Sequence, residues 1–212
     1  MSILKKVLVV LVVGIGGFLA FAATRPDTYR VERSQRIDAP AEVVFAQLDN
    51  FKSWAAWSPW EKRDPAMKRA LEGPASGVGA AYSWEGNKEV GQGKMTITES
   101  KPPRGGSAET AHVSIRLEFV KPFASVASSE FIVKPEADDH AATVSWVMEG
   151  RNNLMGKAFG VFMNMDKMIG GDFESGLSNL KSVAEAESAK AAAAKAAAAN
   201  AAPPPAQAAV TP

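Results

Sequence analysis

The sequence contains no cysteine and only two histidines, so it offers few of the side chains that hold metal ions in proteins. Disulfide bonds and thiolate metal sites are therefore excluded. His112 is predicted on the polar side of a strand and His140 in a turn, and no cysteine supports either of them. We expect neither a metal site nor a cofactor.

Signatures of nucleic-acid binding and of common catalytic centres are also missing. Lys and Arg number 24 against 23 Asp and Glu, for a net charge of +1, and no basic cluster accompanies a nucleic-acid motif. The glycine pairs at 77/79 and 91/93 lack the third glycine and the following helix of a phosphate-binding loop. No serine lies in a G-x-S-x-G turn. We expect no nucleic-acid partner.

An apolar run at residues 7–23 follows Lys5 and Lys6 and ends before Arg25. Its length is at the lower limit for crossing a bilayer and is long for a signal-peptide core. Residues 1–25 are therefore either an uncleaved single-pass anchor in the cytoplasmic membrane or a signal segment cleaved after Ala22. Both alternatives carry the rest of the chain to the periplasmic or extracellular side, because the lysines favour the cytoplasmic side.

Residues 28–186 are predicted to form one α+β domain with a sheet of about seven strands. The clearest strand alternates Val113, Ile115, Leu117 and Phe119 with polar residues, which indicates a sheet that is covered on one face. A short helix begins at Asp38-Ala39-Pro40 and ends near Asn50. The expected strands are 28–37, 70–72, 81–84, 93–100, 113–119, 125–134 and 142–149.

A single amphipathic helix is predicted from Met155 to about Ala184, lying on the sheet. At 100° per residue its apolar face carries Met155, Phe159, Phe162, Ile169, Phe173, Leu177 and Leu180, with Met163 and Met165 at the margins. Gly170-Gly171 indicates either a kink or close packing. Residues 187–212 should be an Ala/Pro-rich tail, partly helical and then disordered.

Aromatic and sulfur-containing side chains are the candidate ligand-binding residues. Trp54, Trp57 and Trp60 lie within seven positions, and they either plug one end of the sheet or line the mouth of an apolar pocket, where each indole adds an N–H donor. The other candidates are core residues or cavity wall: Tyr82, Trp84, Met95, Trp146, Met148, Phe159, Phe162 and Met163.

Asp166 breaks the apolar face of the predicted helix. An unpaired buried carboxylate is costly, so it must find a partner, take up a proton or reach water. Three interpretations remain open: a bond to a strand arginine or a tryptophan N–H, a polar anchor inside a ligand cavity, or a general acid or base. It is the one weak catalytic candidate.

The order of elements resembles the helix-grip fold of the START-like or SRPBCC superfamily, which includes Bet v 1-type proteins and polyketide cyclase/dehydrase-like proteins. The matching segments are 37–45, 54–60 with Asp64-Pro65, 78–84, 91–95 and 173–181. The resemblance implies a curved antiparallel sheet around a long C-terminal helix and a deep apolar cavity. It also implies lipids, polyketides or other apolar molecules as ligands, and carries over no catalytic residue.

Three functional hypotheses follow. The first is a membrane-tethered protein whose cavity binds an apolar, lipid-like or polyketide-like molecule. The second is a cyclase or dehydratase that uses Asp166 with Tyr82 or Glu85 as acid and base. The third is an envelope protein-interaction module with a filled core. The oligomeric state is left open by the sequence.

Overall fold

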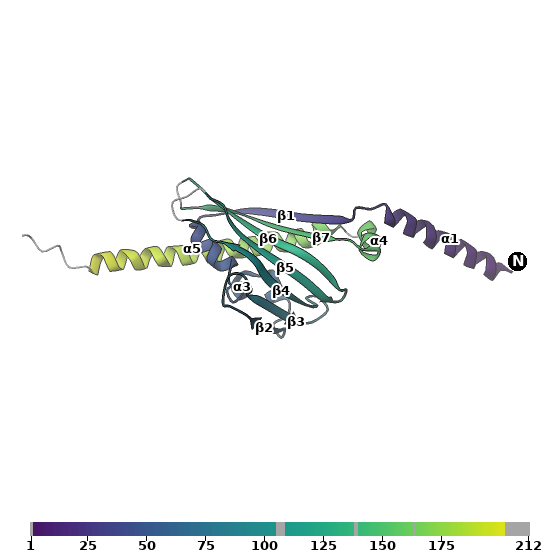
Figure 1. Cartoon of the computed structure of the whole chain (residues 1–212), viewed down its shortest axis with the longest axis horizontal. Coiled ribbons are helices and arrows are strands. Elements are labelled where there is room, and N and C mark those ends of the chain that lie inside the picture. The colour runs from purple at the N-terminus through teal and green to yellow at the C-terminus, as the bar shows by residue number, and fades with distance from the viewer. Residues whose placement is uncertain (1, 105–108, 138–139, 163, 202–212) are drawn as a thin grey trace, which may run out of the picture.

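A computed structural model describes residues 2–104, 109–137, 140–162 and 164–201 of the chain. Figure 1 shows a sheet-and-helix body with one helix projecting from each end. The N-terminal helix α1 (Ile3–Ala23) leaves one end of the body, and the C-terminal half of α5 (Met165–Ala201) leaves the other. Within the described residues, α1 is the one helix long and apolar enough to cross a membrane, with a mean hydropathy of 2.4.

All seven strands form one antiparallel sheet in the order β1-β7-β6-β5-β4-β3-β2. The predicted α+β helix-grip fold is confirmed, and so is the seven-stranded sheet. The strands are β1 (Thr28–Ile37), β2 (Lys68–Glu72), β3 (Ala81–Glu85), β4 (Gln92–Lys101), β5 (Ala111–Lys121), β6 (Ser125–Pro135) and β7 (Ala142–Arg151).

The core lies between the inner face of this curved sheet and α5, and short helices complete it. These are α2 (Ala41–Leu48), α3 (Trp54–Trp57) and the 3-10 helix η1 (Pro59–Lys62), all of which contact α5. Trp146 on β7 stacks on Phe173 of α5, with ring centroids 4.0 Å apart. Leu177 and Leu180 are fully buried further along the same helix.

The prediction of one unbroken helix from Met155 is wrong, because the chain forms α4 (Leu154–Phe162) and then α5. An asparagine precedes each helix, and its side chain accepts a hydrogen bond from the first turn. Asn153 Oδ1 accepts a hydrogen bond from Gly156 N at 2.8 Å, and Asn164 Oδ1 accepts one from Lys167 N at 3.2 Å. These are N-cap bonds, which satisfy backbone donors at the start of a helix. Met163 lies outside the described residues.

Gly170 and Gly171 lie inside α5 and do not interrupt it. Gly170 allows the helix backbone to pass close to the Arg33 guanidinium, and a Cβ at Gly176 would lie 2.8 Å from the Trp146 ring. Close packing, the second of the two alternatives, therefore explains Gly170 and Gly176. A Cβ at Gly171 would meet nothing within 4 Å.

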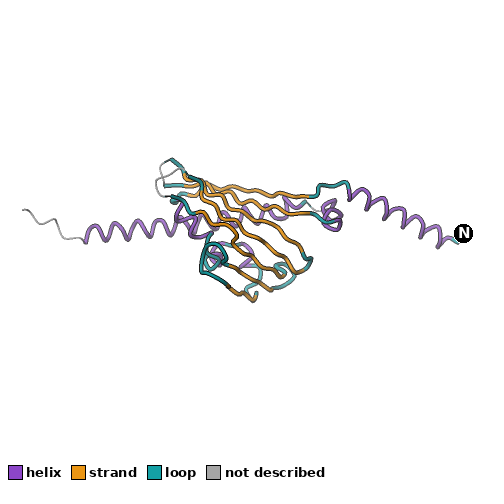
Figure 2. The backbone as a smooth tube through the Cα atoms, in the orientation of Figure 1, coloured by secondary structure: helices purple, strands orange, loops and turns teal. Residues whose placement is uncertain are grey.

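The strand register defines two ends of the sheet. At what we call the proximal end, which follows α1, Thr28 pairs with Arg151 and Ala127 with Gly150. At the far end, Ile37 and Pro135 both pair with Ala142. Helix α5 runs from the proximal end toward the far end (Figure 2). At the far end Glu185 accepts a hydrogen bond from Asp38 N.

Candidate functional site: a cavity between the sheet and helix α5

A cavity of about 560 Å³ lies between the inner face of the sheet and the first turns of α5. This volume is in the range of small-molecule binding sites, roughly 300–1,000 Å³. Its wall is mostly aromatic and aliphatic. The residues that line it are Trp54, Ser58, Trp60, Arg63, Met67, Tyr82, Trp84, Lys88, Glu89, Val90, Gly91, Met95, Leu117, Phe119, Lys121, Pro122, Phe123, Ser125, Ser129, Trp146, Met148, Met165, Met168, Ile169, Asp172 and Phe173.

Strand alternation places the sheet side of this wall. Met95 on β4 pairs with Leu117 on β5 and Tyr82 on β3, so the three side chains point to the same face. Ser129 and Met148, which are paired on β6 and β7, continue that face. On the other side Ile169 and Phe173 lie one turn apart on α5, as an apolar helix face requires.

The exposure of the lining residues shows that the cavity has one closed and one open end. Trp54, Ser58, Ser129 and Trp146 are buried, whereas the turns 88–91 and 121–125 contain exposed residues. Both turns belong to the proximal end, because Gln92 at the start of β4 pairs with Lys121 at the end of β5. The cavity therefore opens at the proximal end, close to α1.

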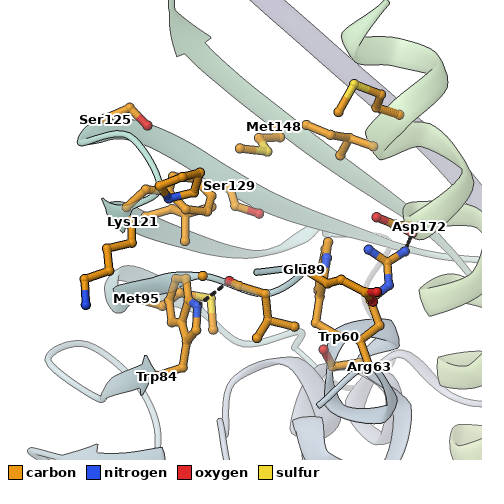
Figure 3. Close-up of a pocket in the computed structure, with 18 of the residues that line it drawn as sticks. Trp60, Arg63, Trp84, Glu89, Met95, Lys121, Ser125, Ser129, Met148 and Asp172 are labelled. Carbon is orange, nitrogen blue, oxygen red and sulfur yellow. Dashed lines mark hydrogen bonds and ion pairs between the residues drawn. The ribbon is translucent and has the colours of Figure 1, made fainter. Parts of the chain in front are cut away.

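The cavity wall is mostly apolar, and several of its polar groups have partners within the protein. Arg63 forms an ion pair with Asp172, and Trp84 Nε1 donates a hydrogen bond to the Val90 carbonyl at 2.9 Å (Figure 3). The buried Ser129 hydroxyl accepts a hydrogen bond from Trp146 Nε1 at 2.9 Å. A wall with few unpaired polar groups favours an apolar ligand.

Tyr82 is the most perturbed titratable group of the wall. Its hydroxyl donates a hydrogen bond to Glu61 Oε1 at 2.7 Å, and Arg69 Nε donates to Glu61 Oε2 at 2.7 Å. Burial raises the pKa of Tyr82 well above its ordinary value, and the hydrogen bond to Glu61 raises it further. The Tyr82 hydroxyl therefore keeps its proton and donates it in a hydrogen bond to the Glu61 carboxylate.

The three clustered tryptophans have different positions. Trp57 is fully buried in the core and does not line the cavity, whereas Trp54 and Trp60 do. The indole N–H groups of Trp54 and Trp57 donate to the backbone carbonyls of Leu48 and Gln47. Trp60 Nε1 has no acceptor among the residues that the structure describes. Of the three, Trp60 alone therefore has an indole donor available to a ligand.

Other candidates from the sequence divide in the same way. The ones that line the cavity, besides Trp54 and Trp60, are Tyr82, Trp84, Met95, Trp146 and Met148. Phe159 and Phe162 do not line it: they belong to α4 and are 43% and 77% exposed. The prediction that Phe159 and Phe162 face the sheet is wrong, because the helix is interrupted between α4 and α5 and α4 packs against α1.

Asp166 lies on the surface and not at the centre of an apolar face. Its carboxylate accepts hydrogen bonds from Arg33 Nη1 at 2.8 Å and Nη2 at 3.1 Å, and Arg33 Nε also donates to Glu174 at 2.6 Å. The hydrogen bond from Arg33 holds the pKa of Asp166 below its ordinary value. Of the three interpretations of Asp166, the structure shows the bond to a strand arginine.

Several wall residues were missed from the sequence. Leu117 and Phe119 share the apolar phase of the clearest strand, so the alternation carried a signal for them. Arg63 and Asp172 come together only in the folded chain, 109 positions apart, and nothing in their local sequence indicates that pairing. Within the described part of the chain, no group of three or more His, Asp or Glu side chains is arranged to hold a metal.

The comparisons agree with this geometry. The family described as "Polyketide cyclase / dehydrase and lipid transport" matches residues 28–185, and the chain belongs to that family and so to the SRPBCC superfamily. A search of curated protein sequences finds no match.

Solved structures share the fold at low identity. A hypothetical protein from Helicobacter pylori is 10% identical with a TM-score of 0.54, over 74% of this chain and 88% of that one. A truncated norcoclaurine synthase from Thalictrum flavum is 10% identical with a TM-score of 0.52, over 73% and 91%. A protein from Chromobacterium violaceum is 16% identical with a TM-score of 0.49, over 76% and 99%. At these identities the first two likenesses support the fold alone.

Proposed function

We propose that this protein binds an apolar, lipid-like molecule in the cavity while α1 tethers it to the cytoplasmic membrane. The observation that carries the proposal is the cavity itself. Its wall is built mainly from aromatic, methionine and aliphatic side chains, Arg63 and Asp172 form an ion pair with each other, and the Ser129 hydroxyl is bonded to Trp146. Such a site gains free energy by removing apolar surface from water and gives little reward to a charged ligand.

Helix length supports the tether. At 1.5 Å per residue the uncharged residues 7–23 of α1 span roughly 26 Å, the lower limit for crossing the hydrocarbon core of a bilayer. Lys5 and Lys6 favour the cytoplasmic side for the N-terminus, so the domain lies on the opposite side of the membrane. A signal segment cleaved after Ala22 is the alternative, and the mass of the mature chain decides between the two.

Polar groups at the mouth suit a ligand with one polar end. The Trp60 indole donor and the Arg63–Asp172 pair lie on the α5 side of the cavity, and Ser125 and Lys121 lie on the opposite side (Figure 3). The ligand class is therefore amphiphilic, with an apolar body inside and a polar group at the proximal end. The cyclase or dehydratase hypothesis loses its carboxylate, because Asp166 is held on the surface by Arg33.

Native mass spectrometry of the full chain, extracted from its own membranes, tests the proposal. We expect a co-purifying apolar species that solvent extraction releases. Met95→Trp places a large ring in the cavity and should lower the occupancy. Thr96→Trp adds the same ring to the opposite face of β4 and should leave the occupancy unchanged. A chain without bound species, or equal occupancy in both variants, contradicts the proposal.

A further inference from the structure

Apolar side chains are exposed around the cavity mouth. On the turn between β5 and β6, the cavity-lining residue Phe123 is 62% exposed. On α4 and the first turns of α5 the exposed apolar residues are Leu154, Met155, Phe159, Phe162 and Met168. The ring centroids of Phe123 and Phe159 are 5.8 Å apart, so Phe123 is continuous with the exposed residues of the helices. We call these six residues the apolar rim.

A short linker fixes where the rim lies relative to the membrane. Only Thr24–Asp27 separate the end of α1 from the start of β1, and four residues reach at most roughly 14 Å. Asn152 shortens this reach, because its backbone N–H donates to Asp27 O at 2.8 Å. If α1 crosses the bilayer, the proximal end of the sheet must therefore lie at the membrane surface.

Contacts between α4 and α1 place α4 at the depth of the bilayer boundary. Lys157 of α4 donates to the carbonyl of Ala23, the last residue of α1, and forms an ion pair with Asp27. Phe162 stacks on Phe18 at 5.5 Å. Phe18 is five residues before Ala23, which is roughly 7.5 Å further into the membrane along the helix axis. The end of α4 therefore reaches below the level at which α1 leaves the membrane.

From this geometry we propose that the apolar rim is a bilayer-docking surface, which seats the cavity mouth on the outer leaflet of the phospholipid membrane that holds α1. Helix α4 lies in the interface like other amphipathic surface helices, with Lys157 at headgroup level and Phe162 among the acyl chains. The ligand then passes between leaflet and cavity past Phe123, without crossing water. This inference rests on the proposed function, since it requires α1 to remain in the membrane.

Spin labels on single cysteines test the docking surface, and the absence of native cysteine makes each label unique. The full chain is reconstituted in liposomes of phosphatidylethanolamine and phosphatidylglycerol. Labels at Phe123→Cys, Phe159→Cys and Phe162→Cys should lose collisions with a water-soluble nickel chelate and gain collisions with oxygen. Label signals at Val78→Cys and Ser128→Cys are the controls: both sites are exposed, the first in the turn before β3 and the second on the outer face of β6.

Two outcomes overturn the docking proposal. The first is equal access of the nickel chelate to labels at positions 123, 159 and 78. The second is protection of position 128 in place of 123, which would place the outer face of the sheet on the membrane. The native mass measurement is independent of both outcomes. A bound ligand together with exposed rim labels would contradict only the docking proposal. Protected rim labels together with an empty cavity would contradict only the ligand-binding proposal.

Discussion

At the scale of the residue, Trp57 and Trp60 are close in sequence but belong to different parts of the molecule. Trp57 is fully buried and contacts the rings of Trp54, Phe131 and Trp146. Trp60 is half-buried, lines the cavity and meets Trp146 edge-on at 5.7 Å. The sequence indicated that the tryptophan cluster was unusual. It did not indicate that the turn between α3 and η1 would place Trp57 in the core and Trp60 in the cavity wall.

Substitution of the two tryptophans should separate stability from binding. Trp57→Ala removes a fully buried ring, and we expect it to lower the free energy of unfolding by about 3–5 kcal/mol. Trp60→Ala should cost far less stability, because water already reaches the ring, and should reduce ligand occupancy. Urea unfolding measures the first effect and native mass spectrometry the second. Unchanged occupancy with Trp60→Ala, or a loss of stability with Trp60→Ala as large as that with Trp57→Ala, would contradict this division.

Tyr29 and Tyr82, the two tyrosines of the chain, make a pH prediction. Burial raises the pKa of both, and the Glu61 hydrogen bond also raises that of Tyr82. A raised pKa in the folded state means that the neutral phenol stabilises the fold. This stabilisation is complete below the unfolded pKa of about 10 and is lost as the pH rises toward the folded pKa values.

Absorbance of ionised tyrosine should therefore rise at a higher pH in the folded chain than in urea. Tyr82→Phe should remove the later part of the folded-state titration and leave the Tyr29 part in place. Equal midpoints in the folded and the unfolded chain would show that neither hydroxyl is held neutral by the fold.

At the scale of the element, the break between α4 and α5 is the main feature that periodicity did not reveal. Apolar residues recur at helical spacing through 155–180 without a phase change, so the pattern predicts one helix. The signals were Asn153 and Asn164, whose side chains cap the two helices. From the sequence alone, an asparagine on the polar face of a helix cannot be distinguished from one at an N-cap. The difference is whether its side chain accepts a hydrogen bond from a following backbone N–H.

Strands were easier to predict than helices in this chain. The sheet has one buried face, so period-two alternation located each strand to within a few residues, as in β5, where His112, Ser114, Arg116 and Glu118 alternate with apolar residues. Five cavity residues on those strands were predicted, namely Tyr82, Trp84, Met95, Trp146 and Met148, whereas Leu117 and Phe119 were missed. Wall residues contributed by turns, such as Phe123 and Val90, could not be found in this way, because a turn has no period.

Two glycines of α5 give opposite predictions for the same substitution. Gly171→Ala adds a methyl group in open space, and we expect it to raise the free energy of unfolding by up to about 1 kcal/mol. Gly176→Ala forces its Cβ to 2.8 Å from the Trp146 ring, and we expect a loss of roughly 1–3 kcal/mol. Thermal unfolding of both variants measures the difference. Two changes of the same sign would mean that α5 is not packed on Trp146 as described.

The Arg33 pairs hold the start of α5 against β1 from outside the cavity. Asp166→Asn should leave ligand occupancy unchanged, because its side chain does not line the wall and Arg33 keeps its bond to Glu174. Its effect on stability should be small, as for other exposed ion pairs. Trp60→Ala, measured in parallel, shows that the assay detects a loss. A large loss of occupancy with Asp166→Asn would return the carboxylate to a binding or catalytic role.

At the scale of the whole molecule, the fold places the apolar helix α1 and the cavity mouth at the same end. Helix α1 adjoins the proximal end, and the C-terminal half of α5 points away beyond the far end (Figure 1). The sequence predicted both terminal helices but not their placement, which depends on the register of β1 with β7 and on the direction of α5. The expected tail at 187–212 continues α5 to Ala201, and residues 202–212 lie outside the described residues.

Photo-crosslinking with a diazirine-bearing phospholipid in membranes that contain the full chain tests the central claim, that this cavity holds a membrane-derived apolar molecule. We predict crosslinked peptides from the cavity wall on β4 to β7, in addition to peptides from α1. Met95→Trp should reduce the wall crosslinks and Thr96→Trp should leave them unchanged. Crosslinks that are confined to α1 and α4 in the unsubstituted chain would contradict the claim, because they would show a membrane-bound domain whose cavity stays empty.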